Sequence, residues 1–154
     1  LKNQAAIALY VIEKILKPDV IYILGPGTTT RVIADLLDQK KTLLGVDLLL
    51  NGKIIARDVN ESDILRLIDG KEARIIVTPI GGQGFIFGRG NQQISPKVIR
   101  RVGIENIIVI CTKSKIQGIR ALRVDTGDPE LDERMRGRID VIIDYNQVVT
   151  VPIE

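Results

Sequence analysis

Three continuous apolar runs constrain the fold of this chain more than any other feature of its sequence. They are VIYIL at residues 20–24, RIIVTPI at 74–80 and NIIVIC at 106–111. A strand with one solvated face alternates apolar and polar residues, so runs without alternation are typical of parallel strands that are covered on both faces. Segments with helical spacing separate the runs. We therefore predict an α/β fold, with an open, mostly parallel sheet and helices on both of its faces.

Turn and cap signals place other elements. Helical spacing of the apolar side chains over residues 4–17 ends at Pro18, which predicts one helix there. An Asn-Gly pair at 51–52 between two apolar stretches predicts an inserted β-hairpin. The Ser-Pro pair at 95–96 and the Asp-Pro pair at 128–129 each combine an N-cap with proline in the first helical turn. We expect helices to begin at both places.

Chain length and charge narrow the possible classes of function. The 154 residues, of which 45% are hydrophobic, suffice for a single domain with a sizeable core, which we expect to span residues 1–154. The first residue is Leu1 rather than Met, so we expect a carboxyl-terminal fragment of a longer protein. The net charge of +3 comes from scattered side chains and only 3% of residues are aromatic, which disfavours a nucleic-acid partner.

The scarcity of cysteine and histidine limits the possible chemistry. Cys111 is the only cysteine, so neither a disulfide framework nor a cysteine metal site is predicted, and a reducing, cytoplasmic compartment is the default expectation. No apolar run is long enough to span a bilayer, so we expect no membrane partner. The sequence contains no histidine, which removes the commonest metal ligand and histidine-based catalysis. Any acid or base must be a carboxylate, a lysine, a tyrosine or Cys111, and the sequence identifies no catalytic residue.

A glycine-containing turn follows the first apolar run. The sequence GPGTTTR at 25–31 leads from a strand into a helix, an arrangement that directs main-chain N–H groups and the helix dipole at an anion. The alternative is that one threonine caps the helix and the others have no special role. The spacing matches neither the nucleotide P-loop nor the dinucleotide-binding glycine motif. We predict phosphate binding by Gly25, Gly27, Thr28, Thr29, Thr30 and Arg31.

A second loop, between residues 80 and 94, concentrates glycine. Ordering glycine is entropically unfavourable, so this concentration needs a reason. One reason is a concave nest for phosphate, to which arginine and amide side chains add hydrogen bonds. The other is a tight connection between two layers, with amides that face water. We favour ligand binding because three apolar residues at 85–87 anchor the loop, and we predict that the ligand contacts Gly81, Gly82, Gln83, Gly84, Arg89, Asn91 and Gln92.

Acidic residues border the same region. Asp47 interrupts an apolar strand of the hairpin, which places it either at an exposed edge or in a site. Asp58 and Glu61 follow the hairpin, where a strand end and a helix cap explain them. The apolar runs and a further predicted strand at 121–126 would all end at one carboxyl edge of a parallel sheet. We therefore predict a single crevice that also contains Asp47 and Asp125.

Four long stretches carry a resemblance to a known family. They are GPGTTTRVIADLL at 25–37, LLGVDLLLNGKIIARDVNES at 43–62, RIIVTPIGGQGFIFGRGNQQISPKVIRRVG at 74–103 and VDTGDPELDERMRG at 124–137. They resemble the carboxyl-terminal part of prokaryotic ATP-NAD kinase-like proteins, in the branch related to acetoin-catabolism X proteins. The resemblance extends over nearly the whole chain, from about residue 18 to residue 137.

The resemblance implies a protein made of two parts. The family's amino-terminal domain carries a Gly-Gly-Asp-Gly motif that binds the phosphoryl donor and supplies the catalytic carboxylate. The GGQG sequence at 81–84 has Gln where that motif has Asp, and we take it as a separate loop. In NAD kinases proper, the carboxyl-terminal domain is a β-rich layer with an Asn-Glu pair at the NAD ribose. Asn60 and Glu61 would correspond to that pair.

On this resemblance, the chain is expected to be the substrate-side domain of an ATP- or polyphosphate-dependent NAD kinase-like phosphotransferase of NADP biosynthesis. It would bind a phosphorylated nucleotide or metabolite, NAD or a sugar phosphate, in the glycine-rich crevice. ATP or polyphosphate with Mg²⁺ and the missing amino-terminal domain would belong to the full-length protein, so the isolated chain would bind without turnover. A homo-oligomer is compatible with these features. The alternative is a sugar-phosphate binding or isomerase-like module, in which Asp47, Asp58 or Glu61 transfers a proton.

Overall fold

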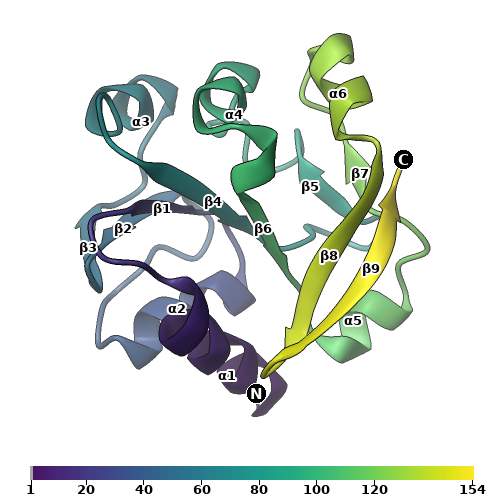
Figure 1. Ribbon diagram of the computed structural model, residues 1–154, viewed down its shortest axis with the longest axis horizontal. Coiled ribbons are helices and arrows are strands. Elements are labelled where there is room, and N and C mark those ends of the chain that lie inside the picture. The colour runs from purple at the N-terminus through teal and green to yellow at the C-terminus, as the bar shows by residue number, and fades with distance from the viewer. Residues whose placement is uncertain (1) are drawn as a thin grey trace.

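A computed structural model describes residues 2–154 as an α/β fold built on a seven-stranded sheet (Figure 1). The strand order is β3-β2-β1-β4-β6-β8-β9. The four central strands are parallel to one another, and antiparallel pairing adds β2 and β3 at one edge and β9 at the other. The strands of this sheet are β1 (Ile21–Leu24), β2 (Asp47–Leu50), β3 (Lys53–Ala56), β4 (Ala73–Val77), β6 (Ile107–Ile110), β8 (Gly137–Asp144) and β9 (Gln147–Ile153).

Helices cover both faces of this sheet. One face carries α1 (Lys2–Tyr10), the π-helical turn η1 (Val11–Ile15) and α2 (Thr28–Leu36), and the other carries α3 (Glu61–Leu67), α4 (Pro96–Val102) and α6 (Pro129–Met135) (Figure 1). Successive residues of the central strands enter opposite clusters. The cluster with α1 and α2 contains Ile7, Ile33, Tyr22 and Ile76, and the other cluster contains Ile64, Val98, Leu131, Ile23 and Ile75. The predicted burial of the apolar runs on both faces is therefore confirmed.

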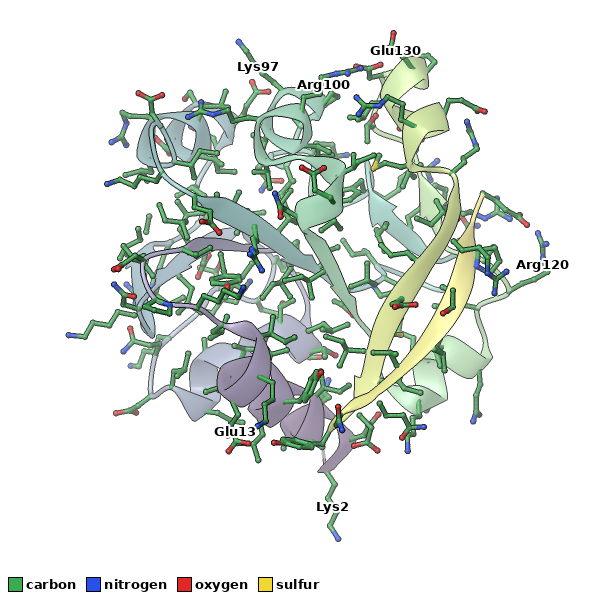
Figure 2. All side chains as sticks on the ribbon, viewed as in Figure 1. Lys2, Glu13, Lys97, Arg100, Arg120 and Glu130 are labelled. Carbon is green, nitrogen blue, oxygen red and sulfur yellow. The ribbon has the colours of Figure 1, made fainter. Side chains whose placement is uncertain are left out.

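The α/β architecture differs from the β-rich layer of NAD kinases proper, because helices here separate the parallel strands. No helix in the described part of the chain is long and apolar enough to cross a membrane. Charged side chains project outward from several different elements, as Figure 2 shows for Lys2, Glu13, Lys97, Arg120 and Glu130. The positive charge is thus spread over the surface.

Local signals in the sequence located most elements correctly. Asn51 and Gly52 form the hairpin turn with φ angles of 51° and 77°, as the Asn-Gly pair predicts. The Ser95 hydroxyl accepts a hydrogen bond from Val98 N–H, so the predicted start of α4 is confirmed. The Asp128 carboxylate likewise caps α6. The helix predicted over 4–17 is shorter, since α-helical geometry ends at Tyr10 and η1 follows it.

One strand was assigned to the wrong sheet. The segment predicted as a strand at 121–126 contains only the two-residue β7 (Arg123–Val124), which pairs in parallel with β5 (Phe85–Phe87) and lies outside the large sheet. Ile86, Phe87 and Val124 pack into the same cluster as α3, α4 and α6. The small sheet therefore covers part of that face instead of extending the large sheet.

Two glycines make this pairing possible. A Cβ on Gly88, whose φ is +90°, would lie 1.7 Å from the carbonyl oxygen of Asp125. A Cβ on Gly84, whose φ is +83°, would lie 2.6 Å from the carbonyl oxygen of Ala121. Two of the five glycines in this loop are thus explained by the close approach of two backbones, which is the structural alternative to a phosphate nest.

We expect Gly88→Ala to lower the free energy of unfolding by about 2 kcal/mol or more, because the substitution combines a backbone clash with a positive φ. Urea unfolding followed by circular dichroism measures the change. Gly82→Ala is the matched control, since nothing lies within 4 Å of its added Cβ, and it should alter stability by less than about 0.5 kcal/mol. Equal stability of the two variants would contradict this role of Gly88.

Candidate functional site

The loops that leave β1, β4 and β6 meet at the carboxyl edge of the large sheet. A Cβ on Gly27 would lie 2.9 Å from Cγ2 of Thr78, so the loop after β1 touches the loop after β4. Lys115, in the short helix α5 (Lys113–Gln117) that follows β6, donates from Nζ to the carbonyl oxygen of Pro79 at 2.6 Å. The structure therefore brings together three of the four loops that were expected to converge.

The amino terminus of α2 is the most polar part of this edge. Its N-cap is Gly27, which has a φ of 122° and no side chain, and no side-chain hydrogen bond caps the helix. The main-chain N–H groups of Thr28 and Thr29 find no acceptor among residues 2–154. These groups carry the positive end of the helix dipole. The nine-residue helix thus offers bare donors at the predicted anion-binding turn.

The three threonine hydroxyls at this helix end differ in role. Thr30 donates from Oγ1 to the carbonyl oxygens of Gly25 and Gly27 at 2.6 and 3.1 Å, so it holds the turn in shape. The hydroxyls of Thr28 and Thr29 accept hydrogen bonds from Nε2 of Gln4 at 2.9 and 3.1 Å. Two of the three hydroxyls therefore face a polar side chain of α1, and one is structural.

The first turn of α1 connects the loops at this edge, which the sequence did not indicate. Besides the contacts of Gln4, the side chain of Asn3 accepts from Lys113 N–H at 2.8 Å and donates to the carbonyl oxygen of Ile143 at 2.7 Å. The ammonium group of Lys113 pairs with Asp144 at 2.7 Å, and this pair lowers the pKa of the Asp144 carboxyl. Sequence reasoning missed Asn3 and Gln4 because these contacts span more than twenty positions of the chain.

Asp47 lies beside the end of β1 and is fully buried. Its carboxylate accepts from the Thr42 hydroxyl at 2.6 Å, from Thr42 N–H at 2.8 Å and from Asp58 N–H at 2.9 Å. The carboxylate thus joins the loop before β2 to the end of β3. Of the two explanations left open by the sequence, an exposed edge is wrong, because no part of the side chain reaches solvent.

Lys41 is a buried cation that the sequence did not single out. Its Nζ donates to the carbonyl oxygens of Thr42 and Gly45 at 2.9 and 3.0 Å. Burial lowers its pKa from 10.5 to about 8; the nearby Asp47 carboxylate opposes this shift and Arg31 adds to it. No local pattern marks Lys41, because it follows another lysine that is exposed.

Asn60 and Glu61 begin α3, on the other face of the sheet from α2. The Asn60 side chain accepts from Asp63 N–H, and the Asp63 side chain accepts from Asn60 N–H, which forms a capping box. Glu61 is exposed in the first turn of the helix. Helix capping accounts for Asn60, and the pairing of these two residues with a ribose stays a prediction.

The second glycine loop occupies two places. Gly81, Gly82 and Gln83 form an exposed turn after Ile80, and Gly82 and Gln83 line a hollow of about 250 Å³ with residues 118–121. Gly84 directly precedes β5, and the remaining residues follow the far end of that strand. There Arg89 pairs with Asp125 at 3.0 Å and stacks 4.2 Å above the Phe85 ring, buried Asn91 binds Ile86 O and Gly88 N–H, and Gln92 is exposed.

The single crevice expected from the sequence is therefore divided. The turn at 25–31 and Asp47 lie at the carboxyl edge of the large sheet, whereas Arg89 and Asp125 lie at the carboxyl ends of the small sheet. The sequence predicted Asp125 at the carboxyl edge of the large sheet because residues 121–126 were expected to form a strand of that sheet, whereas β7 belongs to the small sheet. Ligand contact at either place stays a prediction.

Two observations limit the chemistry of the described residues. Cys111 is buried, and burial raises the pKa of its thiol to about 11, so the thiolate needed for nucleophilic attack is scarce at neutral pH. Among residues 2–154, no group of three histidine, cysteine, aspartate or glutamate side chains is arranged to hold a metal ion. Besides the buried Asp47 carboxylate, the carboxyl edge thus presents hydrogen-bond donors and cations, among them the N–H groups of Thr28 and Thr29 and the side chain of Arg31.

Comparison with known families identifies the family of the chain. The sequence matches the ATP-NAD kinase C-terminal domain family over residues 17–153. The chain belongs to this family, which confirms the resemblance found in the sequence and supports an NAD kinase-like phosphotransferase that uses ATP. No curated protein and no solved structure matches the chain.

The lowered pKa of Lys41 makes stability depend on pH. Between about pH 8 and 10.5 the unfolded chain binds more protons at Lys41 than the folded chain, so the folded state gains stability as pH rises through this window. Lys41→Met removes this gain. We expect the wild-type free energy of unfolding to rise relative to that of the variant by about 3 kcal/mol across the window.

Urea unfolding at several pH values measures this difference. Lys40→Met is the matched control, because the neighbouring Lys40 side chain is exposed; its stability should follow the wild type at every pH. If the curves of wild type and Lys41→Met run parallel to each other, Lys41 is not a buried, perturbed cation.

Proposed function

We propose that this chain is the substrate-side domain of an ATP- or polyphosphate-dependent NAD kinase-like phosphotransferase. In this proposal it binds a phosphate group of the nucleotide substrate at the carboxyl edge of the large sheet, against the amino terminus of α2. The protein would work in the cytoplasm and form NADP. The observation that carries the proposal is the family match over residues 17–153, which includes the whole of this edge except the first turn of α1.

The geometry of α2 supports the placement of the phosphate. The unpaired N–H groups of Thr28 and Thr29 and the helix dipole provide a ready anion site. Arg31 is half-buried in the same helix and makes no salt bridge within the described residues, so its charge is available to a phosphate. Gln4 already binds the Thr28 and Thr29 hydroxyls, and a phosphate would replace or share these contacts.

The phosphoryl donor is assigned to the rest of the full-length protein. ATP and polyphosphate act with Mg²⁺, which proteins usually hold through one or two carboxylates and the phosphates of the substrate. The carboxylate of Asp47 at this edge is fully buried and accepts three hydrogen bonds, so it does not fit that ion. We therefore derive no metal-dependent step for this chain. Its own contribution would be to bind and orient the acceptor, while an amino-terminal domain would supply the donor site and the catalytic carboxylate.

The sugar-phosphate isomerase alternative has less support. It needs a carboxylate that can take a proton from a substrate carbon. Asp47 is fully buried and accepts three hydrogen bonds, so its oxygens are already engaged. Glu61 is exposed in the first turn of α3, which lies on the opposite face of the sheet from α2. Asp58 lies nearer, since its N–H binds the Asp47 carboxylate, but it is exposed after the end of β3 and, among the described residues, does not line a pocket with the α2 turn.

A thermal-shift screen of this chain against NAD, NADP, ATP, polyphosphate and sugar phosphates tests the proposal. A ligand that binds only the folded state raises the melting temperature by mass action. We expect NAD or NADP to do so. Stabilisation by sugar phosphates alone would favour the alternative, and no stabilisation by any of these compounds would contradict a phosphate site.

Thr28→Val tests the position of the site. The substitution keeps the shape of this exposed side chain and removes the hydroxyl, so we expect it to weaken NAD binding by about three- to tenfold with little change in stability. Isothermal titration calorimetry measures the affinity. Thr150→Val is the matched control, because Thr150 is also exposed but lies on β9, where its hydroxyl binds Asp140. Equal affinities of the two variants would place the ligand elsewhere.

A further inference from the structure

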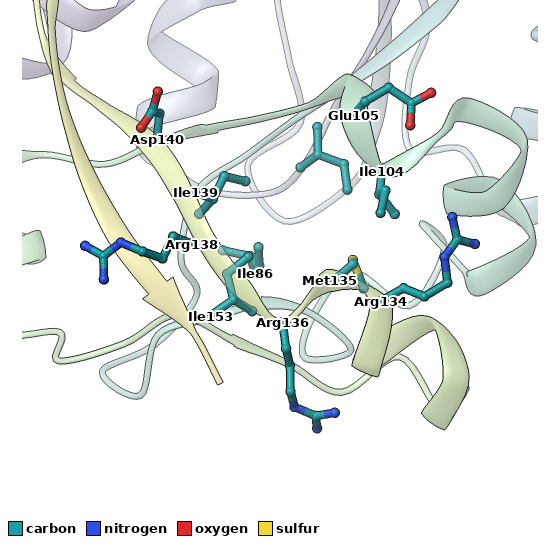
Figure 3. A pocket seen from close by; sticks show the side chains of 11 residues that line it. Ile86, Ile104, Glu105, Arg134, Met135, Arg136, Arg138, Ile139, Asp140 and Ile153 are labelled. Carbon is teal, nitrogen blue, oxygen red and sulfur yellow. The ribbon is translucent and has the colours of Figure 1, made fainter.

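A cavity of about 510 Å³ opens at the amino edge of the large sheet, opposite the edge considered above (Figure 3). Its walls come from the starts of β6 and β8, from the end of α6 and from Ile153 at the end of β9. Its volume lies within the range of small-molecule pockets, roughly 300–1,000 Å³. None of the residues assigned to the proposed function lines it.

The cavity exists because two neighbouring parallel strands diverge. β6 and β8 pair only at Val109 with Val141 and at Ile110 with Ile142. Towards its amino end β8 continues for four more residues, 137–140, which remain paired with β9 but not with β6. If β6 and β8 were paired along their whole length, Ile107 and Ile139 would be neighbours in the ladder and their main chains would leave no space between them. Here that space is open and both side chains are partly exposed.

Main-chain polar groups point into this gap. Pro152 accepts a hydrogen bond from Leu122 N–H, so its carbonyl faces away from β8. Arg138 is the partner of Pro152 in the antiparallel register. In an antiparallel ladder, when the main-chain groups of one residue point away from the partner strand, those of the residue opposite also point away. The N–H and C=O of Arg138 therefore point away from β9 and towards β6. Cys111 N–H binds Ile142 O, which confirms that even-numbered residues of β8 face β6.

The walls of the cavity are apolar and its rim is charged (Figure 3). Arg136 pairs with Glu133, which partly neutralises it. The Asp140 carboxylate accepts from the Thr150 hydroxyl, and the Arg138 guanidinium donates to the Thr150 carbonyl oxygen at 3.1 Å. Arg134 makes no salt bridge or side-chain hydrogen bond within residues 2–154. The three rim arginines outnumber the two rim carboxylates. The apolar walls are formed by Ile86, Ile104, Ile107, Met135, Ile139 and Ile153.

We propose that this cavity binds an amphipathic anion, with an aromatic or acyl body and one carboxylate, sulfonate or phosphate group. The apolar body lies among the isoleucine side chains and Met135. The anionic group lies at the rim, where the Arg138 N–H can donate and the rim arginines outnumber the carboxylates. This site is separate from the phosphotransferase site, so either can exist without the other.

Anilinonaphthalene sulfonate is a suitable probe, since it joins an aromatic body to one sulfonate. Met135 is the only methionine of the sequence and lines the cavity, so a carbon-13 methyl label on methionine gives one NMR signal that reports on this site. We expect the probe to shift this signal in a saturable manner. A titration that leaves the Met135 signal unmoved would overturn the proposal.

Two comparisons test the role of charge. Phenylnaphthylamine has the same aromatic body without the sulfonate and should bind at least about tenfold more weakly to the wild type. Replacing Arg134, Arg136 and Arg138 by alanine should weaken sulfonate binding by about tenfold and leave phenylnaphthylamine binding unchanged. The control replaces the exposed residues Arg57, Arg66 and Arg120, which alters the net charge equally. Equal affinity of the wild type for the two probes would overturn the proposal, and this comparison needs no variant. An equal loss of sulfonate affinity in the two triple variants would also overturn it.

Discussion

The burial of β1, β4 and β6 on both faces is the constraint on which the rest of the structure depends. Side chains such as Ile23 and Ile75 enter one hydrophobic cluster, and Tyr22 and Ile76 enter the other. A strand that is apolar on both sides must be covered on both sides, and parallel strands need crossover connections, which here run through helices. The same arrangement collects the loops that follow the strands at one edge of the sheet. The donor-rich edge at α2 is therefore a consequence of how the core is buried.

The two ends of the sheet differ in how completely they are packed. At the hairpin end, the buried carboxylate of Asp47 accepts hydrogen bonds from Thr42 and from the main chain of Asp58, which ties the loop before β2 to the end of β3. Lys41 is enclosed by the same loop and donates to its carbonyls. At the other end, β8 stays paired with β9 over its whole length but separates from β6 towards its amino end. The first end is closed by buried polar contacts, and the second contains the cavity.

The candidate site was predictable where local chemistry determines it. The turn at 25–31 lies at a strand-to-helix junction, as its glycines and threonines indicate. The second glycine loop was harder to interpret because glycine satisfies two different needs. Gly84 and Gly88 permit two backbones to approach, which a sequence cannot distinguish from close approach to a ligand. Arg89 likewise pairs with Asp125 and stacks on Phe85, contacts that depend on the position of β7.

The sequence by itself determined the α/β class, the hairpin turn at Asn51 and Gly52, the caps at Ser95 and Asp128 and the family of the chain. Each of these depends on residues close together in the sequence or, for the family, on long stretches of sequence compared as a whole. Only the tertiary structure decided that β7 pairs with β5, that Gln4 reaches Thr28, and that β6 and β8 diverge to leave a cavity. The physical reason is that these contacts join distant segments, and their free energy depends on the packing of the whole core rather than on local propensity.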